Sequence, residues 1–202
     1  NFDSRRKREG IYKSSKLFIN NKTIKVISLD VRYFKDNFKK NYNNKINKKY
    51  LEDNDLTKTI LGQKQWVWLE EQINDDYDFL VLLSSFQVLS KAHGWEKWNN
   101  FPLERKKLLN LLKVLKVPKL ILSGDRHFGG IYKHETQNLY EVTASSFNQN
   151  ILTADEEDLL RIGKLISDNN FGLLEIDSKN ITVKIVSGMK EYKQEHNKLK
   201  II

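Results

Sequence analysis

The run Lys119-Leu-Ile-Leu-Ser-Gly-Asp125-Arg126-His127-Phe128 carries the clearest information about the fold. Its apolar part, Leu120 to Leu122, ends abruptly at Ser123-Gly124, and an acid, a base and an imidazole follow. This pattern is typical of a buried strand in a parallel sheet, whose carboxyl end delivers polar side chains to a crevice where ligands bind. The run therefore predicts an α/β fold with a candidate site directly after this strand.

The segments before this run alternate between helix and strand patterns. Trp66, Leu69 and Ile73 fall at helical spacing and predict a helix over 63–73, and residues 78–84 form an apolar run that ends in serine. After Pro102, a suitable first-turn residue, a leucine stripe predicts a second helix. Helix, strand, helix and strand in this order indicate parallel βαβ units.

Strands and turns dominate the pattern on both sides of this region. Residues 24–30 predict a further strand that closes on Asp30, and the Asn- and Lys-rich residues 35–50 predict a surface loop. Residues 129–143 and 171–186 each predict an antiparallel hairpin. Thr153 and Glu156 have the spacing of a capping box and predict a short helix, with leucines at positions 159, 160 and 165.

Composition narrows the class of protein. The chain has 202 residues, 39% of them hydrophobic, and no cysteine, so it is one domain or a piece of one without disulfides or thiolate metal ligands. No apolar run approaches the roughly 20 residues that cross a bilayer. Residue 1 is Asn and the only methionine is Met189, so we expect a longer natural chain, with any targeting peptide outside these residues.

The net charge of +9 allows two interpretations. Much of the excess lies at Arg5-Arg6-Lys7-Arg8 and in residues 39–49, where solvated loops are the simpler explanation. A basic balance is also compatible with a non-catalytic nucleic-acid-binding domain. Aromatic side chains, which would stack on bases, do not alternate with these charges. We therefore expect no nucleic-acid partner and keep that domain as the alternative.

Asp125 and His127 are the first candidates for chemistry. If the segment is extended, both side chains point to one face, and a carboxylate and an imidazole are suitable ligands for zinc, iron or manganese. A metal there would lower the pKa of a bound water and supply a nucleophile. The alternative is that Asp125 caps a turn and His127 packs as an ordinary half-buried histidine. The residues alone do not decide between the two.

Three further polar side chains are candidates for contact with a substrate. Arg126 either binds an anionic group or is a surface arginine. Gln87 follows the neighbouring strand and so shares the same sheet edge. His93 begins the cluster His93-Gly-Trp-Glu-Lys-Trp98, which either lines a pocket entrance or seals the core under a loop.

Eight segments, in this order, resemble the C-terminal half of the PhoD-like alkaline phosphatases, within the calcineurin-like metallophosphoesterase superfamily. The segments are Arg5-Arg-Lys-Arg-Glu-Gly-Ile-Tyr12, Leu29-Asp-Val-Arg-Tyr-Phe34, Leu61-Gly-Gln-Lys-Gln-Trp-Val-Trp-Leu-Glu70, Ser84-Ser-Phe-Gln-Val-Leu89, His93-Gly-Trp-Glu-Lys-Trp98, Ser123-Gly-Asp-Arg-His127, Leu139-Tyr-Glu-Val-Thr-Ala-Ser145 and Asn169-Asn-Phe-Gly-Leu-Leu174. They cover nearly the whole chain.

The resemblance implies half of an αββα metallophosphoesterase sandwich, with a mixed sheet of βαβ units followed by β-hairpins. Residues 1–202 would then be the C-terminal part of a single domain whose upstream half is not in this chain. The implied activity is metal-dependent hydrolysis of phosphate mono- or diesters. An inactive phosphatase-like domain is a further alternative, and the 202 residues alone are expected to be incomplete as an enzyme.

The resemblance also implies roles for the candidate residues. Asp125-Arg126-His127 resembles the last metal motif of the superfamily, so His127 and Asp125 are expected to be catalytic metal ligands, for iron, calcium, zinc or manganese. Gln87 stands near a position where many relatives carry a ligand histidine. Where relatives continue Gly-Leu after Ser146, this chain has Phe147-Asn148-Gln149, which changes the expected substrate pocket. The family is typically periplasmic or secreted. Metal identity, ester preference and oligomeric state stay open.

Overall fold

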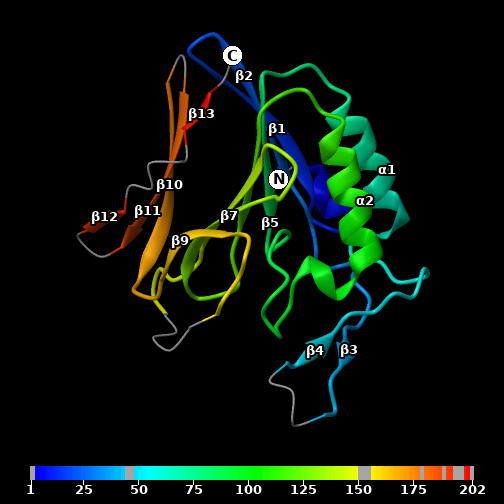
Figure 1. Cartoon of the computed structure of the whole chain (residues 1–202). Coiled ribbons are helices and arrows are strands. Elements are labelled where there is room, and N and C mark those ends of the chain that lie inside the picture. Colours follow the sequence, from blue (N-terminus) through cyan, green and yellow to red (C-terminus); the bar gives the residue numbers. More distant parts are fainter. Residues whose placement is uncertain are drawn as a thin grey trace.

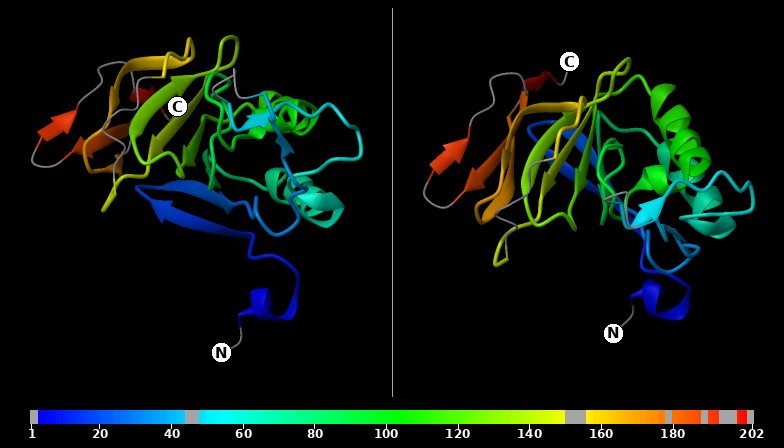
Figure 2. Two further views of the ribbon diagram at one scale, coloured as in Figure 1. Left: turned by 90° about the horizontal axis from the view of Figure 1, so that it is seen from below. Right: turned by 60° about the horizontal axis from the view of Figure 1, so that its bottom comes forward.

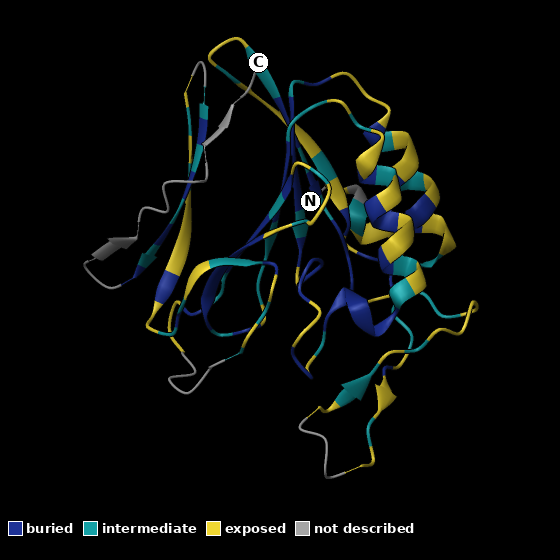
Figure 3. Ribbon diagram, viewed as in Figure 1, coloured by how far each residue is buried: buried dark blue, intermediate teal, exposed yellow. Residues whose placement is uncertain are grey.

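Three layers make up the computed structural model, which describes residues 3–43, 48–149, 156–177, 180–187, 190–192 and 198–200. Two helices cover one face of a seven-stranded sheet, and a four-stranded sheet covers the other face (Figure 1). The central strands are almost completely buried between these layers, as Figure 3 shows. The predicted α/β class, as a partial sandwich with a mixed sheet, is confirmed.

The seven-stranded sheet has the order β1-β2-β5-β6-β8-β7-β9. Its strands are β1 (Lys13–Ile19), β2 (Lys22–Ser28), β5 (Phe79–Ser84), β6 (Lys119–Ser123), β8 (Leu139–Ala144), β7 (Gly129–Lys133) and β9 (Arg161–Ile166). β2, β5, β6 and β8 run parallel, whereas β1, β7 and β9 pair antiparallel with their neighbours. Because Ser84, Ser123 and Thr143 lie opposite one another, the loops that follow β5, β6 and β8 begin at one sheet edge.

The helices α1 (Gly62–Ile73) and α2 (Pro102–Lys113) each bury one face against the sheet. Leu69 and Leu108 are fully buried and belong to one apolar cluster with Ile27 and Leu82 of the central strands. The 3-10 helix η2 (Trp98–Asn100) leads into α2, and Pro102 occupies the first turn as its missing N–H allows. α1 matches the predicted range of 63–73 to within one residue, and α2 begins at Pro102, where the sequence predicts the start of the second helix.

The second sheet contains β10 (Asn170–Ile176), β11 (Asn180–Ser187), β12 (Lys190–Tyr192) and β13 (Lys198–Lys200). β10 pairs antiparallel with β11, as the predicted hairpin requires, and β12 and β13 also pair with β11. Alternate side chains of β11, including Val183 and Ile185, are buried against Ile24, Val81 and Ile131 of the central sheet. This alternation is the normal signature of a strand with one buried face.

Two small elements project from the layers. The N-terminal 3-10 helix η1 (Ser4–Lys7) extends away from both sheets, which is visible in the two views of Figure 2. The strands β3 (Lys39–Lys40) and β4 (Tyr50–Leu51) pair antiparallel inside the stretch predicted as a loop. Residues 44–47 of that stretch lie outside the described residues. Within the described part of the chain, the helices are too short and too polar to span a bilayer.

Two predictions about local structure were wrong or incomplete. The helix expected after Thr153 is absent where the chain is described, because Arg161–Ile166 forms the edge strand β9 and Leu159 is fully exposed rather than part of an apolar stripe. Thr153 itself lies outside the described residues. The strand β1 was not predicted because most of its side chains are exposed and its backbone alone joins it to β2.

Glu104 joins the two helices and supplies a test of the packing. Its carboxylate accepts hydrogen bonds from the Trp66 indole at 2.9 Å, from the Ile60 N–H at 3.0 Å and from the Thr59 hydroxyl at 3.1 Å. Glu104→Ala leaves the buried indole N–H unpaired and is expected to lower the free energy of unfolding by about 2–4 kcal/mol.

The matched control is Glu70→Ala, which removes an exposed carboxylate whose ion pair, within the described part of the chain, is with Lys107 at 3.4 Å. This change should alter the free energy of unfolding by less than about 0.5 kcal/mol. Urea denaturation of both variants measures the difference. Equal effects would show that Glu104 does not hold the helices together.

Candidate functional site

The candidate site lies at the edge where β2, β5, β6 and β8 end. Asp30 follows β2, Ser85 to Gln87 follow β5, Gly124 to Phe128 follow β6, and Ser145 follows β8. The predicted meeting of the 84–87 and 123–127 segments is therefore correct. Gly124 lies close to the loops after both neighbouring strands, since a Cβ added to it would stand 3.5 Å from the Ser145 Cβ atom and 3.7 Å from the Ser85 carbonyl oxygen.

The Gly124–Phe128 segment is a turn and not an extended strand. Asp125 and His127 both have positive φ, of 72° and 54°, which is uncommon for residues other than glycine. The Ser145 hydroxyl accepts the N–H groups of Arg126 and His127 at 3.1 and 3.0 Å and so holds the turn in this shape. The expectation that an extended backbone aims both side chains at one face was wrong. Unusual backbone of this kind is concentrated at functional sites.

Asp125 is exposed and forms an ion pair that the sequence did not suggest. The Arg32 guanidinium donates to its carboxylate at 3.0 Å and also pairs with Glu96. Arg32 comes from the loop after β2, whose shape is set by the Asp30 carboxylate through the N–H groups of Arg32 and Tyr33. Three loops thus meet at this ion-paired cluster.

Gln87 is fully buried, and its side-chain amide is hydrogen-bonded to the first of two linked hydroxyl groups. Its side-chain N–H donates to the Thr143 hydroxyl at 2.9 Å, and that hydroxyl lies 2.8 Å from the Ser123 hydroxyl. Its amide oxygen has no hydrogen-bond partner among the described residues. Gln87 therefore lies beneath the sheet edge, with one unsatisfied acceptor.

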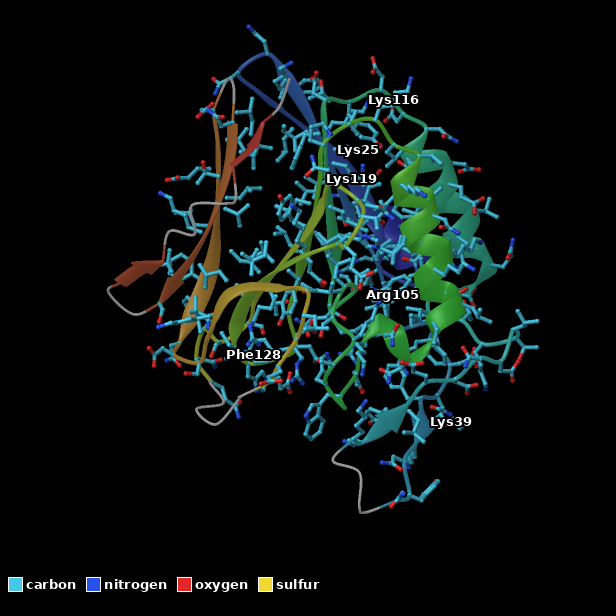
Figure 4. All side chains as sticks on the ribbon, viewed as in Figure 1. Lys25, Lys39, Arg105, Lys116, Lys119 and Phe128 are labelled. Carbon is cyan, nitrogen blue, oxygen red and sulfur yellow. The ribbon has the colours of Figure 1, made fainter. Side chains whose placement is uncertain are left out.

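The loop that carries Gln87 is fixed by two buried charged residues that the sequence did not single out. The Glu141 carboxylate accepts the N–H groups of Val88 and Leu89 at 2.8 and 2.6 Å, and Arg105 donates to the carbonyl oxygens of the same two residues at 2.6 and 2.9 Å. Burial raises the pKa of Glu141, against the effect of these N–H groups. Arg105 belongs to α2, as Figure 4 shows, and its side chain reaches from that helix to this loop.

His93 and Arg126 are both buried, with 4% and 5% of their surface exposed. The Nδ1 atom of His93 accepts the Trp95 N–H at 3.1 Å, so the neutral ring carries its proton on Nε2. Burial and the charges of Arg126 and Lys97 lower the pKa of His93 to about 2. Arg126 pairs with Glu156 and lies over the ring of Phe128, which is labelled in Figure 4. Arg126 is therefore not a surface arginine.

The described residues contain no group of three or more His, Asp or Glu side chains arranged to hold a metal ion. Asp125 and His127 have suitable donor atoms, but Asp125 already has a cationic partner in Arg32. These two residues fit part of a metal site and not a whole one. His127 is half-buried, as both interpretations of the sequence allow.

PhoD and GAP50 are among the solved structures that match this chain. The structure of PhoD matches with a TM-score of 0.67 over 95% of this chain, at 15% sequence identity. The chain has a PhoD-like fold. GAP50, described as the anchor in the inner membrane complex of Plasmodium, matches with a TM-score of 0.66 over 96% of the chain, at 17% identity. At these identities the likeness concerns the fold alone.

The chain spans only 44% of the PhoD structure and 55% of the GAP50 structure. No protein-family model matches the sequence, and no curated protein matches it either. The predicted resemblance to PhoD is thus confirmed at the level of the fold. The roles of individual residues stay predictions.

The burial of His93 predicts a pH-dependent stability. The pKa of His93 is lower in the folded state than in the unfolded state, so below about pH 6.5 the imidazole binds a proton only when the chain unfolds. Each further unit by which the pH falls therefore lowers the free energy of unfolding by about 1.4 kcal/mol. In His93→Asn this contribution disappears, so the stability gap between wild type and variant should shrink by about 2 kcal/mol from pH 7 to pH 5.

His134→Asn is the control, because His134 is only half-buried and lies in an exposed turn. The dependence of its free energy of unfolding on pH should stay closer to that of the wild type. Denaturation by urea at several pH values measures all three proteins. Parallel profiles for wild type and His93→Asn would contradict a neutral buried imidazole.

Proposed function

We propose that this chain is part of a metal-dependent phosphoesterase, a PhoD-like alkaline phosphatase that hydrolyses phosphate mono- or diesters. The observation that carries the proposal is the Gly124–Phe128 turn at the carboxyl end of β6, within a PhoD-like fold. Ligands of open α/β sheets bind at this edge. Asp125 and His127 lie in this turn with unusual backbone angles, as residues of functional sites often do.

His127 and Asp125 are the proposed metal ligands from this chain, and further ligands would come from protein outside these 202 residues. The coverage of 44% of the PhoD structure leaves room for such a part. A bound divalent or trivalent ion, whether iron, calcium, zinc or manganese, would supply a water of lowered pKa as nucleophile. For Asp125 to bind the metal, Arg32 would have to break its ion pair with Asp125. Arg32 would keep its second ion pair, with Glu96.

Arg126, His93 and Gln87 are the proposed substrate-binding residues, Arg126 and His93 by direct contact and Gln87 through the Thr143 hydroxyl. Arg126, which belongs to the turn, and His93 are buried donors, and a phosphate ester needs donors and positive charge around its oxygen atoms. Gln87 is held under the turn by Thr143 and acts on the site through it. A periplasmic or secreted location, by the same family resemblance, completes the proposal.

The second candidate is an inactive phosphatase-like domain. Two observations favour it: the ion pair of Asp125 with Arg32, and the likeness in fold to GAP50, which is described as the anchor in the inner membrane complex of Plasmodium. A basic nucleic-acid-binding domain is the third, prompted by the net charge of +9. Nucleic-acid binding weakens steeply with salt and ignores chelators, whereas metal-dependent hydrolysis is abolished by a chelator and restored by metal.

His127→Ala tests the phosphoesterase directly in the natural protein that contains this chain. We expect phosphate ester hydrolysis to fall by about 100-fold or more, together with a loss of bound metal, because a ligand is removed. The measurements are turnover of a chromogenic phosphate ester and elemental analysis of the purified protein.

His134→Ala is the control, since His134 lies in the exposed turn between β7 and β8, at the opposite end of β7 from Phe128, and has no proposed role. Activity and metal content should be unchanged in that variant. If His127→Ala kept both as well, its role as a ligand would be wrong. If the wild type held no metal and hydrolysed no ester, the inactive domain would be the better description.

A further inference from the structure

Lys97 is a buried ammonium group next to the candidate site, with only 3% of its surface exposed. Its Nζ atom donates to the carbonyl oxygen of His93, and no carboxylate of the described residues lies within ion-pair distance of it. Burial lowers its pKa to about 8, so the group still carries its charge at neutral pH. A buried charge without a counter-charge is costly and rare in proteins.

Three N–H groups close to Lys97 also lack acceptors. His93 Nε2, Arg126 Nε and Asn100 Nδ2 are shielded from solvent and have no hydrogen-bond partner among the described residues. The other atoms of these side chains are engaged: His93 Nδ1 accepts the Trp95 N–H, and Asn100 Oδ1 accepts the Lys97 N–H at 2.8 Å. Each missing partner is therefore an acceptor and not a donor.

These groups form one neighbourhood. Lys97 contacts both His93 and Asn100, and the charges of Arg126 and Lys97 both act on His93. Of these four side chains, Arg126 forms an ion pair with Glu156, and the carboxylates of Glu52 and Glu156 act on Lys97 from beyond ion-pair distance. Glu52 and Glu156 offset the charge of Lys97 only from a distance and Lys48 opposes them, so Lys97 is a cation without an ion pair in the described part of the chain. Unsatisfied donors and an unpaired cation both require an anion with several oxygen atoms.

We propose that Lys97, His93, Arg126 and Asn100 form an oxyanion-binding site that holds a phosphoryl group without the help of a metal ion. The group would be that of a bound phosphate ester or free inorganic phosphate. In naming phosphate the inference rests on the proposed function, whereas the requirement for an oxyanion rests on the donors alone. Lys97 supplies the charge of this site, and it is the residue on which a test is sharpest.

The test is the binding of inorganic phosphate to the natural protein in the presence of EDTA, measured by calorimetry and by the shift of the thermal unfolding midpoint. Lys97→Met keeps the length of the side chain and removes its charge. The affinity for phosphate should fall at least tenfold. The variant without phosphate should be at least as stable as the wild type, because a methionine needs no counter-charge.

Two further variants complete the experiment. Lys97→Arg keeps the charge and should retain most of the phosphate affinity. Lys91→Met removes an exposed lysine of the same loop, which pairs with Glu135, and should bind phosphate as the wild type does. Competition between phosphate and methyl phosphate separates the two sources of the group, because an ester site accepts both and a site for the free ion accepts phosphate alone.

The inference is overturned if the wild type does not bind phosphate in EDTA, or if Lys97→Met binds it as tightly as the wild type. Its failure is distinguishable from that of the proposed function. Hydrolysis that depends on His127 but phosphate binding that ignores Lys97 would leave the phosphoesterase and remove this site. Binding that depends on Lys97 in a protein without hydrolysis or metal would leave the oxyanion site and remove the phosphoesterase.

Discussion

Glu141 lies on β8 with both carboxylate oxygens buried, and these oxygens accept the N–H groups of Val88 and Leu89 at 2.8 and 2.6 Å. Arg105 of α2 donates to the carbonyl oxygens of the same residues, so a carboxylate and a guanidinium hold both polar sides of one loop. Such a loop cannot move without exposing two opposite charges to an apolar core. The position of Gln87, and of Trp98, whose N–H donates to the Gln87 carbonyl, follows from this arrangement.

The candidate site depends on this rigid loop on one side and on a strained turn on the other. Ser145 supplies the acceptor that keeps Asp125 and His127 at positive φ, and Ser145 is placed by the parallel pairing of β6 with β8. Left-handed backbone costs about 1–2 kcal/mol at each such residue. The sheet therefore fixes the turn, and the turn fixes the directions of an acid and an imidazole at its edge.

Much of the fold could be predicted because its central elements bury one face each. The spacing of Trp66 and Leu69 in α1, and the apolar run of β6, record that burial directly. β1 and β9 escaped prediction because backbone pairing with β2 and β7 places them, and pairing leaves little trace in side-chain type. The leucines near β9 suit a helix stripe as well as a strand.

The site was less predictable than the fold for a related reason. Asp125, Arg126 and His127 were visible as a polar group after a strand, but the turn that orients them depends on a hydroxyl from Ser145. The partner of Asp125 is Arg32, 93 residues away in the chain, and no local pattern indicates it. Lys97 gave no signal at all, since a lysine in a polar loop is normally solvated, and only the packing around it shows that it is buried.

The charges on one side of the Gly124–Phe128 turn are exposed and paired, whereas those on the other side are buried, and this difference decides where a metal ion and an anion would bind. On one side the exposed Asp125 is balanced by Arg32, which has a second carboxylate partner in Glu96 and can therefore give up the first at lower cost. On the other side Arg126 and Lys97 are buried, and of the two only Arg126 has an ion pair in the described part of the chain, with Glu156. Solvent screens the first side and not the second, so an anion gains more from the buried cations than from Arg32. In the proposed enzyme, a metal ion would take the place of Arg32 at Asp125, on the exposed side of the turn. The phosphoryl group would bind to Arg126 and Lys97, on its buried side.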